Sequence, residues 1–165
     1  MADRPGGSCR VGIPIPMAED GKSIYKICRD QAGYTQERAA ELLPCSVRML
    51  ARYESGECSV PDDLAYRMVR LYNSQFLAVE HLRNESRLAA SIIPAVDDCS
   101  LQTAAIRLVN RVLRFASDHR DRQLMEIIED GVITGEERPL MEDIMRDITE
   151  IVRACTEVRI ATKGE

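Results

Sequence analysis

Apolar residues recur at helical spacing along most of the chain, and short breaks interrupt them. Between positions 23 and 72 the breaks fall at Gly33-Tyr34, Pro44-Cys45 and Gly56-Glu57-Cys58. Glycine and proline commonly end helices, and breaks this close together leave room only for short helices joined by tight turns. The pattern therefore predicts four helices, near 23–32, 35–43, 46–55 and 61–72.

A fifth helix is predicted over 73–87, where four apolar residues share one side: Phe76, Leu77, Val79 and Leu82. The segment 92–98 (IIPAVDD) then interrupts the helical pattern. Its proline and paired aspartates indicate an interdomain linker that is able to dock on one of the domains.

Three more helices are predicted after this linker. The first covers about 100–117 and the second passes through 124–128, ending at Asp130-Gly131. The start of the third is predicted from Thr134 and Glu137, which have the spacing of a capping box. Its apolar stripe runs toward Ile160 and consists of Leu140, Ile144, Ile148, Ile151, Val152 and Cys155.

The composition agrees with an all-α fold. Hydrophobic residues make up 45% of the chain but aromatic residues only 4%, with no tryptophan, so the core must be aliphatic and suits helices better than sheets. Residues 1–21 hold three prolines and four glycines and predict a flexible arm. We expect a four- to five-helix domain at 22–87, a linker at 88–100 and a helical module at 101–161.

The six cysteines are scattered without a close pair, and neither histidine lies at ligand spacing from a cysteine. No signal peptide and no apolar run of membrane-spanning length is present, so we expect a cytoplasmic protein with reduced, mostly buried thiols. The sequence predicts no metal, no cofactor and no membrane contact. No nucleophile or phosphate-binding loop accompanies the carboxylates, and we expect that the protein is not an enzyme.

The net charge of −5 is unevenly distributed. Residues 22–72 carry 8 basic and 7 acidic side chains, whereas residues 73–165 carry 12 basic and 17 acidic ones. The acidity therefore belongs to the C-terminal half. A nucleic-acid-binding domain needs only one basic face, so the overall charge leaves such a function open for the N-terminal half.

The most informative stretch is 33–56, which predicts two short helices joined by a turn too tight for an antiparallel pair. Thr35 and Ser46 are good N-caps for these two helices. On the second helix Leu50 and Tyr53 face inward, which leaves Arg48 and Arg52 outside. Two outward arginines suit the major groove of DNA, because arginine can bond bidentately to guanine.

This stretch resembles the Cro/repressor-type (phage-repressor-like, XRE-type) helix-turn-helix family of transcription regulators. The resemblance covers 22–72 and rests on Arg29, Gly33, Thr35-Gln36-Glu37, Ala40, Leu43, Ser46, Leu50, Glu54-Ser55-Gly56 and Pro61. It implies that Gln36 touches the DNA backbone and that Ser46, Val47, Arg48 and Arg52 face the groove. It also implies that Arg29 and Glu54 pair to lock the first helix onto the recognition helix. Lys26 is a further candidate contact to phosphate, or else only a solvated surface residue.

Two residues depart from the family pattern. Pro44 stands where the family usually has glycine in the turn, and Cys45 stands where it prefers an apolar residue. Because a proline disfavours helical ψ at the residue before it, we expect Leu43 to leave the helix and the turn to change shape. The C-terminal half is loosely similar to regulators encoded in prophages and mobile elements of Gram-positive bacteria.

Three functions are compatible with these observations. The first is a sequence-specific regulator that binds double-stranded DNA, with the C-terminal helices forming a homodimer. The second is an antitoxin-like or anti-repressor interaction module that uses the same fold. The third is a catalytic protein with a DNA-targeting domain, which the absence of catalytic motifs disfavours. The outward face of Arg48 and Arg52 favours the first, and we expect a repressor.

Overall fold

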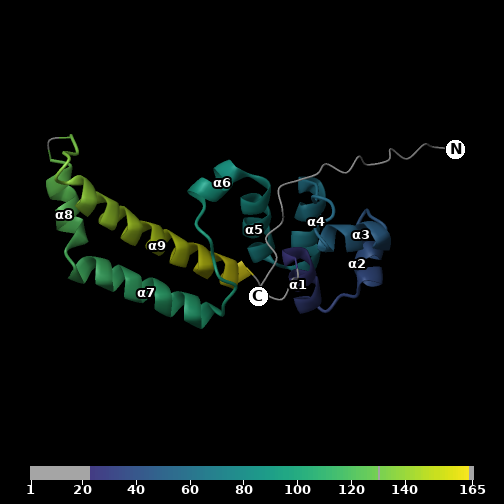
Figure 1. Ribbon diagram of the computed structural model, residues 1–165. Helices are drawn as coiled ribbons and strands as arrows, with labels where there is room; N and C mark the ends of the chain where they lie inside the picture. The colour runs from purple at the N-terminus through teal and green to yellow at the C-terminus, as the bar shows by residue number, and fades with distance from the viewer. Residues whose placement is uncertain (1–22, 130, 164–165) are drawn as a thin grey trace. The chain divides into compact units, whose positions relative to one another are not determined.

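The computed structural model describes residues 23–129 and 131–163 of the chain. Over these residues the fold is all-α, as predicted, with nine helices and no strand (Figure 1). The arm predicted over 1–21 lies outside the described residues. The helices are α1 (Ile24–Gln31), α2 (Gln36–Leu42), α3 (Val47–Glu54), α4 (Asp62–Tyr72), α5 (Gln75–Glu85), α6 (Arg87–Ile92), α7 (Leu101–Ser117), α8 (Arg120–Ile127) and α9 (Arg138–Lys163).

The chain divides into two compact units, Met1–Ile93 and Pro94–Glu165. This boundary falls inside the segment 88–100 that was predicted as a linker. The first residues of that segment are helical instead, because α6 follows α5 after a single extended residue, Ser86. The Ser86 hydroxyl caps α6 by accepting a hydrogen bond from the backbone N–H of Ala89 at 3.1 Å.

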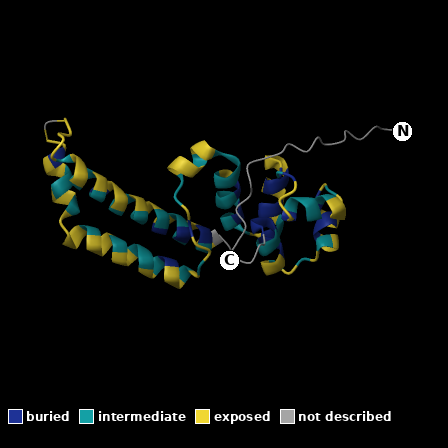
Figure 2. Cartoon of the chain, in the orientation of Figure 1, coloured by how far each residue is buried: buried dark blue, intermediate teal, exposed yellow. Residues whose placement is uncertain are grey.

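The core of the first unit is built from α1 to α5. It is continuous and mostly aliphatic, as the composition predicted, and its most deeply buried large side chains are Tyr25, Leu50, Met68 and Leu77. Figure 2 shows these buried positions as dark blue stretches on the helices of this unit. One predicted core residue is wrong: Leu82 is 49% exposed, and the side of α5 that faces inward carries Leu77 and His81.

In the second unit α7 packs along α9, and α8 connects their far ends (Figure 1). The two long helices run antiparallel, since Arg107 pairs with Glu157 while Arg111 pairs with Glu150. The predicted capping box before α9 is present. The backbone N–H of Thr134 donates to the Glu137 carboxylate at 2.9 Å, and the Glu137 N–H donates to the Thr134 hydroxyl at 3.3 Å.

The apolar stripe predicted on α9 is only partly buried. Ile144 is fully enclosed and packs toward the interior of the unit, but Val152 and Cys155 on the same predicted stripe are exposed. The interior positions near the C-terminal end are instead Ala154, Glu157 and Ile160. The apolar stripe of α9 extends around more than one side of the helix. Its long neighbour α7 packs against one of these sides only.

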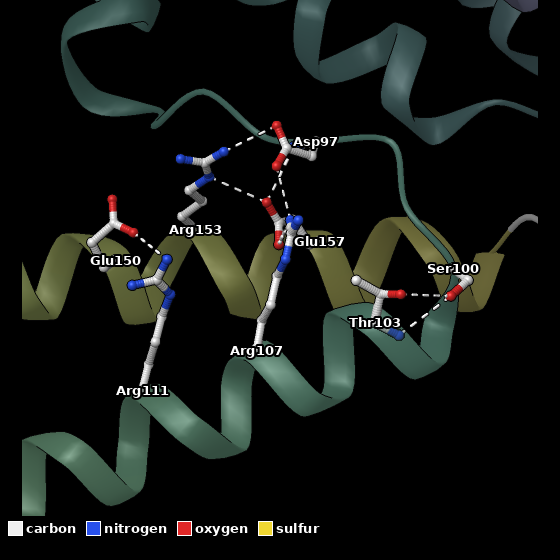
Figure 3. A network of polar contacts seen from close by, with 8 residues as sticks. All are labelled: Asp97, Ser100, Thr103, Arg107, Arg111, Glu150, Arg153 and Glu157. Atoms are coloured by element: carbon white, nitrogen blue, oxygen red, sulfur yellow. Dashed lines mark hydrogen bonds and ion pairs between the residues drawn. The ribbon is translucent and has the colours of Figure 1, made fainter.

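A polar network ties the segment before α7 to the second unit (Figure 3). Glu157 lies at its centre with only 1% of its side chain exposed, and it accepts hydrogen bonds from the Asp97 backbone N–H, Arg107 and Arg153. Asp97 in turn pairs with Arg107 at 2.8 Å and with Arg153 at 3.0 Å. With Val96 buried beside it, the predicted linker docks on this unit.

Candidate nucleic-acid interface

Helices α2 and α3 are joined by the four residues 43–46. Leu43 leaves the helical region, with φ −104° and ψ 151°, as expected for a residue that precedes proline. Ala39 and Ala40 on α2 are buried in the core on which α3 also packs. Small side chains at these positions let α3 lie close across α2. The side of α3 that faces away from α2 and the core is then left uncovered.

The sequence of α3 fixes which side of the helix is uncovered. The Ser46 hydroxyl accepts a hydrogen bond from the Met49 N–H at 3.2 Å and thereby caps the helix. Leu50 is completely buried and Tyr53 packs partly against the same core. Val47 and Arg48 are exposed, as predicted from the helical period, and so is Ser46, which the family resemblance placed there; Arg52 is half-buried. The first turn of α3 is therefore the protruding part of this unit's helix-turn-helix.

Gly56 ends α3 in a left-handed conformation with φ 77°. Its N–H donates to Tyr53 O at 3.2 Å and the next N–H, of Glu57, donates to Arg52 O at 3.0 Å. This pair of bonds is a Schellman motif, which satisfies carbonyls that the helix end leaves unpaired. Because a residue with a side chain is strained at this φ, glycine gives the helix a fixed end.

Arg29 and Glu54 form the buried pair that the family resemblance implied. Arg29 Nε donates to Glu54 Oε1 at 2.7 Å and Arg29 Nη2 donates to Glu54 Oε2 at 3.0 Å, with 6% and 2% of the two side chains exposed. Arg29 also donates to the carbonyl of Tyr34 at 2.6 Å. Hydrogen bonding to Glu54 raises the pKa of Arg29. The bidentate contact fixes α1 and the end of α3 in one mutual orientation.

Gln36, the first residue of α2, is held by the same carboxylate. Its Nε2 donates to Glu54 Oε2 at 2.8 Å, and the side chain is half-buried. A side-chain amide carries two N–H donors, so one more is present on the same nitrogen. The structure thus brings Gln36, Arg29 and Glu54 together in one cluster, whereas sequence analysis treated Gln36 and the pair separately.

Arg48 and Arg52 differ in their surroundings. Arg52 Nε donates to Glu57 Oε2 at 3.1 Å, and 38% of the Arg52 side chain is exposed. Arg48 is exposed and forms no ion pair with any residue that the structure describes. Because an exposed pair of this kind contributes little to stability, Arg52 can exchange Glu57 for another acceptor at small cost.

The remaining candidate, Lys26, lies half-buried on α1. None of the contacts within 23–129 and 131–163 joins it to the outward side of α3. On α2 the exposed Arg38 pairs with Glu41 at 2.7 Å. The cations that the structure places on the protruding helix itself are Arg48 and Arg52.

Sequence analysis missed a polar chain that runs from the buried Tyr25 and His81 to the exposed Asp62. Tyr25 Oη lies 2.8 Å from His81 Nδ1, and His81 Nε2 lies 3.0 Å from Asp62 Oδ1. A neutral histidine with its proton on Nε2 satisfies both contacts, accepting from Tyr25 and donating to Asp62. The available signal was the spacing of His81, four residues after the buried Leu77 and so on the same side of α5.

The cysteines do not form a metal site among the described residues. Cys28 and Cys58 are buried, Cys45 and Cys99 are half-buried and Cys155 is exposed, and none of these five forms a disulfide with another described residue. The prediction of mostly buried thiols is therefore only partly right. Over residues 23–129 and 131–163 there is neither a group of three or more potential metal ligands nor a helix both long and apolar enough to cross a bilayer.

Comparison with known families agrees with this geometry. Residues 26–84 match the family model described as a helix-turn-helix domain, which spans α2 and α3 together with α4 and most of α1 and α5. No curated protein and no solved structure matches the chain. The first unit therefore contains a helix-turn-helix domain, the type of domain found in DNA-binding regulators.

Proposed function

We propose that this protein is a sequence-specific transcriptional regulator, a repressor that binds double-stranded DNA as a dimer. In this proposal α3 (Val47–Glu54) enters the major groove and its first turn contacts the edges of the bases. The observation that carries the proposal is the exposed first turn of α3, bearing Arg48, on a helix whose other side is locked into the core by Leu50 and Glu54.

Fixed orientation matters because base recognition depends on geometry. A bidentate contact between an arginine and guanine is directional, and it discriminates between bases only when the helix that carries the arginine is held in register with the groove. The Arg29–Glu54 pair and the glycine end at Gly56 hold α3 in this way. A helix that only lies on the solvated surface needs neither the buried ion pair nor the fixed glycine end.

The two arginines have different roles in this proposal. Arg48 projects without an ion-pair partner among the described residues and is the first choice for a base contact. Arg52 lies one turn further along α3, and Glu57 competes with DNA for its guanidinium. Ser46 and Val47 directly precede Arg48 at the start of the helix. In this proposal the Ser46 hydroxyl contacts a base and the apolar Val47 side chain contacts a thymine methyl group.

Gln36 is proposed to contact the phosphate backbone. Glu54 holds the Gln36 amide through one N–H, and the second N–H of that nitrogen is the donor for a phosphate oxygen. Such a contact positions the domain without selecting a sequence. Lys26 is proposed as a weaker, long-range contribution to phosphate attraction, since its side chain is partly covered on α1.

Dimerisation is part of the proposal because one helix-turn-helix covers only a few base pairs. Two copies related by a two-fold axis bind half-sites about 34–36 Å apart, or a multiple of that distance, on one face of the duplex. The second unit is the proposed place for pairing, because several large apolar side chains on α7 and α9 are exposed there.

A binding selection from random duplex DNA at a stated salt concentration tests the function. We expect an enriched palindromic site, bound at least about 1,000-fold more tightly than unrelated duplex. The affinity must fall as salt increases, because phosphate contacts release counterions. Recovery of no preferred site, from protein with intact helical circular dichroism, would contradict the proposal.

A further inference from the structure

An uncovered apolar face extends along both long helices of the second unit. On α7 the exposed fractions are 61% for Ile106, 55% for Val109, 47% for Val112 and 59% for Leu113. On α9 Met145 and Val152 are each 46% exposed. Figure 2 shows the exposed and half-buried positions that run the length of α7, where Ala104 is buried.

These residues lie on one side of the helix pair. An α-helix turns about 100° per residue, so a residue two positions further on points to nearly the opposite side. Val109 and Leu113 follow Arg107 and Arg111 by two positions, and on α9 Val152 likewise follows Glu150. Figure 3 shows these arginines meeting their carboxylates across the pair, on the side where Asp97 also lies. The apolar residues therefore lie on the opposite side of both helices.

The spacing of residues on this side matches that of a packed helix seam. On α7 the positions 105, 109, 112 and 116 are Ala, Val, Val and Ala, and on α9 the positions 141, 145, 148, 152 and 155 are Met, Met, Ile, Val and Cys. Alternating steps of four and three residues keep apolar side chains facing a neighbouring helix over several turns. Each long helix therefore carries one seam toward its partner within the hairpin and a second seam that the described part of the second unit leaves largely uncovered. Val109, Val112, Met145 and Val152 are exposed there, whereas Ala105, Met141 and Ile148 are half-buried.

We infer that this face, which we call the α7/α9 apolar face, binds the same face of a second copy of the chain, so that two hairpins form a four-helix bundle. This inference rests on the proposed function, for which it supplies the pairing surface. None of the residues in the two uncovered seams carries a charge, so a two-fold axis through the face brings no like charges together. The other side of the pair holds the ion-pair network.

The size of the face fits a second copy. Half of a large aliphatic residue exposes on the order of 100 Å², so two such faces together bury roughly 1,200 Å², the lower end of the range for specific interfaces. Monomeric proteins rarely leave an apolar patch of several hundred Å² uncovered. Since the face consists mainly of branched aliphatic residues at helical spacing, a matching helical surface covers it best.

Analytical ultracentrifugation of the full chain without DNA tests this inference. We expect a particle of twice the 18.5 kDa chain mass at tens of micromolar. Leu113→Glu and Val152→Glu, one on each helix, should each weaken the dimer at least 10-fold, because a carboxylate then lies within the α7/α9 apolar face. Leu88→Glu is the matched control, since Leu88 is 72% exposed on α6 in the other unit, and it should leave the dimer unchanged.

Two results overturn the inference. One is a wild-type monomer at 100 micromolar, and the other is a dimer that both face variants leave intact while their helical circular dichroism is unchanged. Because the measurement contains no DNA, it is separate from the test of function: a dimer that binds no DNA contradicts the proposed function alone. The salt dependence also distinguishes dimerisation from DNA binding. The dimer affinity should stay constant from 50 to 500 mM NaCl, because the seam is uncharged, whereas the affinity for DNA should fall.

Discussion

Glu54 Oε2 accepts a hydrogen bond from Gln36 Nε2 at 2.8 Å and another from Arg29 Nη2 at 3.0 Å. One buried carboxylate oxygen thus connects the first residue of α2 to α1 and to the last residue of α3. Because Glu54 is nearly inaccessible to water, loss of either donor leaves its charge less well compensated. The Glu54 carboxylate, which holds α3 in place, therefore also fixes the orientation of Gln36, the side chain proposed to contact phosphate.

The first prediction concerns the Arg29–Glu54 pair. Arg29→Met or Glu54→Leu alone should lower the free energy of unfolding of the first unit by about 3–5 kcal/mol, because each removes the bidentate partner of a buried charge and leaves it poorly compensated. Replacing both together should recover much of that loss. Chemical denaturation followed by circular dichroism measures the effect, and single variants as stable as the wild type would show that the pair is exposed to water in solution.

The second prediction separates the two arginines of α3. Arg48→Ala should weaken binding to the selected site by about 1–3 kcal/mol and relax preference at one base position. Arg52→Ala should also weaken binding, by less than Arg48→Ala because Glu57 competes with DNA for the Arg52 guanidinium. Glu57→Gln should therefore tighten binding. Fluorescence anisotropy with labelled duplex gives these affinities, and equal affinity for wild type and both arginine variants excludes α3 as the helix that contacts bases.

The third prediction concerns Gln36. Gln36→Ala should reduce affinity by a similar factor for the selected site and for unrelated duplex, because a phosphate contact carries no base identity. The ratio of the two affinities should stay constant, in contrast to Arg48→Ala, which lowers that ratio. A change in sequence preference on Gln36→Ala would place this side chain against a base instead.

The fourth prediction concerns Glu157. Glu157→Gln removes the charge that Arg107 and Arg153 share and weakens the hydrogen bond to the Asp97 N–H. We expect faster amide hydrogen exchange over 94–129 and 131–163, with protection in α1 to α4 unchanged. Glu150→Gln serves as the control, because its pair with Arg111 is partly exposed and should matter less. Equal effects of both variants would show that burial of Glu157 is unimportant.

The fifth prediction concerns alkaline pH. Burial raises the pKa of Tyr25 and of Tyr72 well above the ordinary value near 10. The folded state therefore holds these protons more tightly than the unfolded chain. Their contribution to stability is complete below pH 10 and is lost as pH rises beyond it. Tyrosinate absorbance should show that Tyr25 and Tyr72 ionise only as the protein unfolds, and titration of all five tyrosines near pH 10 in folded protein would contradict this.

Local structure was largely predictable from the sequence, because caps and helix ends depend on a few neighbouring residues. Thr35 and Ser46 cap their helices through the backbone N–H three residues later, and Leu43 leaves α2 before Pro44. The Arg29–Glu54 pair, 25 residues apart, followed only from resemblance to a family, since spacing alone does not bring such distant residues together.

The sequence by itself thus determined most of the helices, many of their ends and most of their apolar sides, but it missed α6, which lies where a linker was predicted, and it placed Leu82 on the wrong side of α5. Tertiary structure alone decided which apolar side is covered. Periodicity assigns Val152 to the same broad stripe as Ile144, yet only Ile144 is enclosed, because α9 has one long neighbour within its unit. The contact of Glu157 with the Asp97 N–H, 60 residues away, and that of Tyr25 with His81, 56 residues away, join segments with no local relationship. A pattern along one helix contains no information on what packs against it, and that choice is made only when the whole chain minimises its exposed apolar surface and its unpaired buried polar groups.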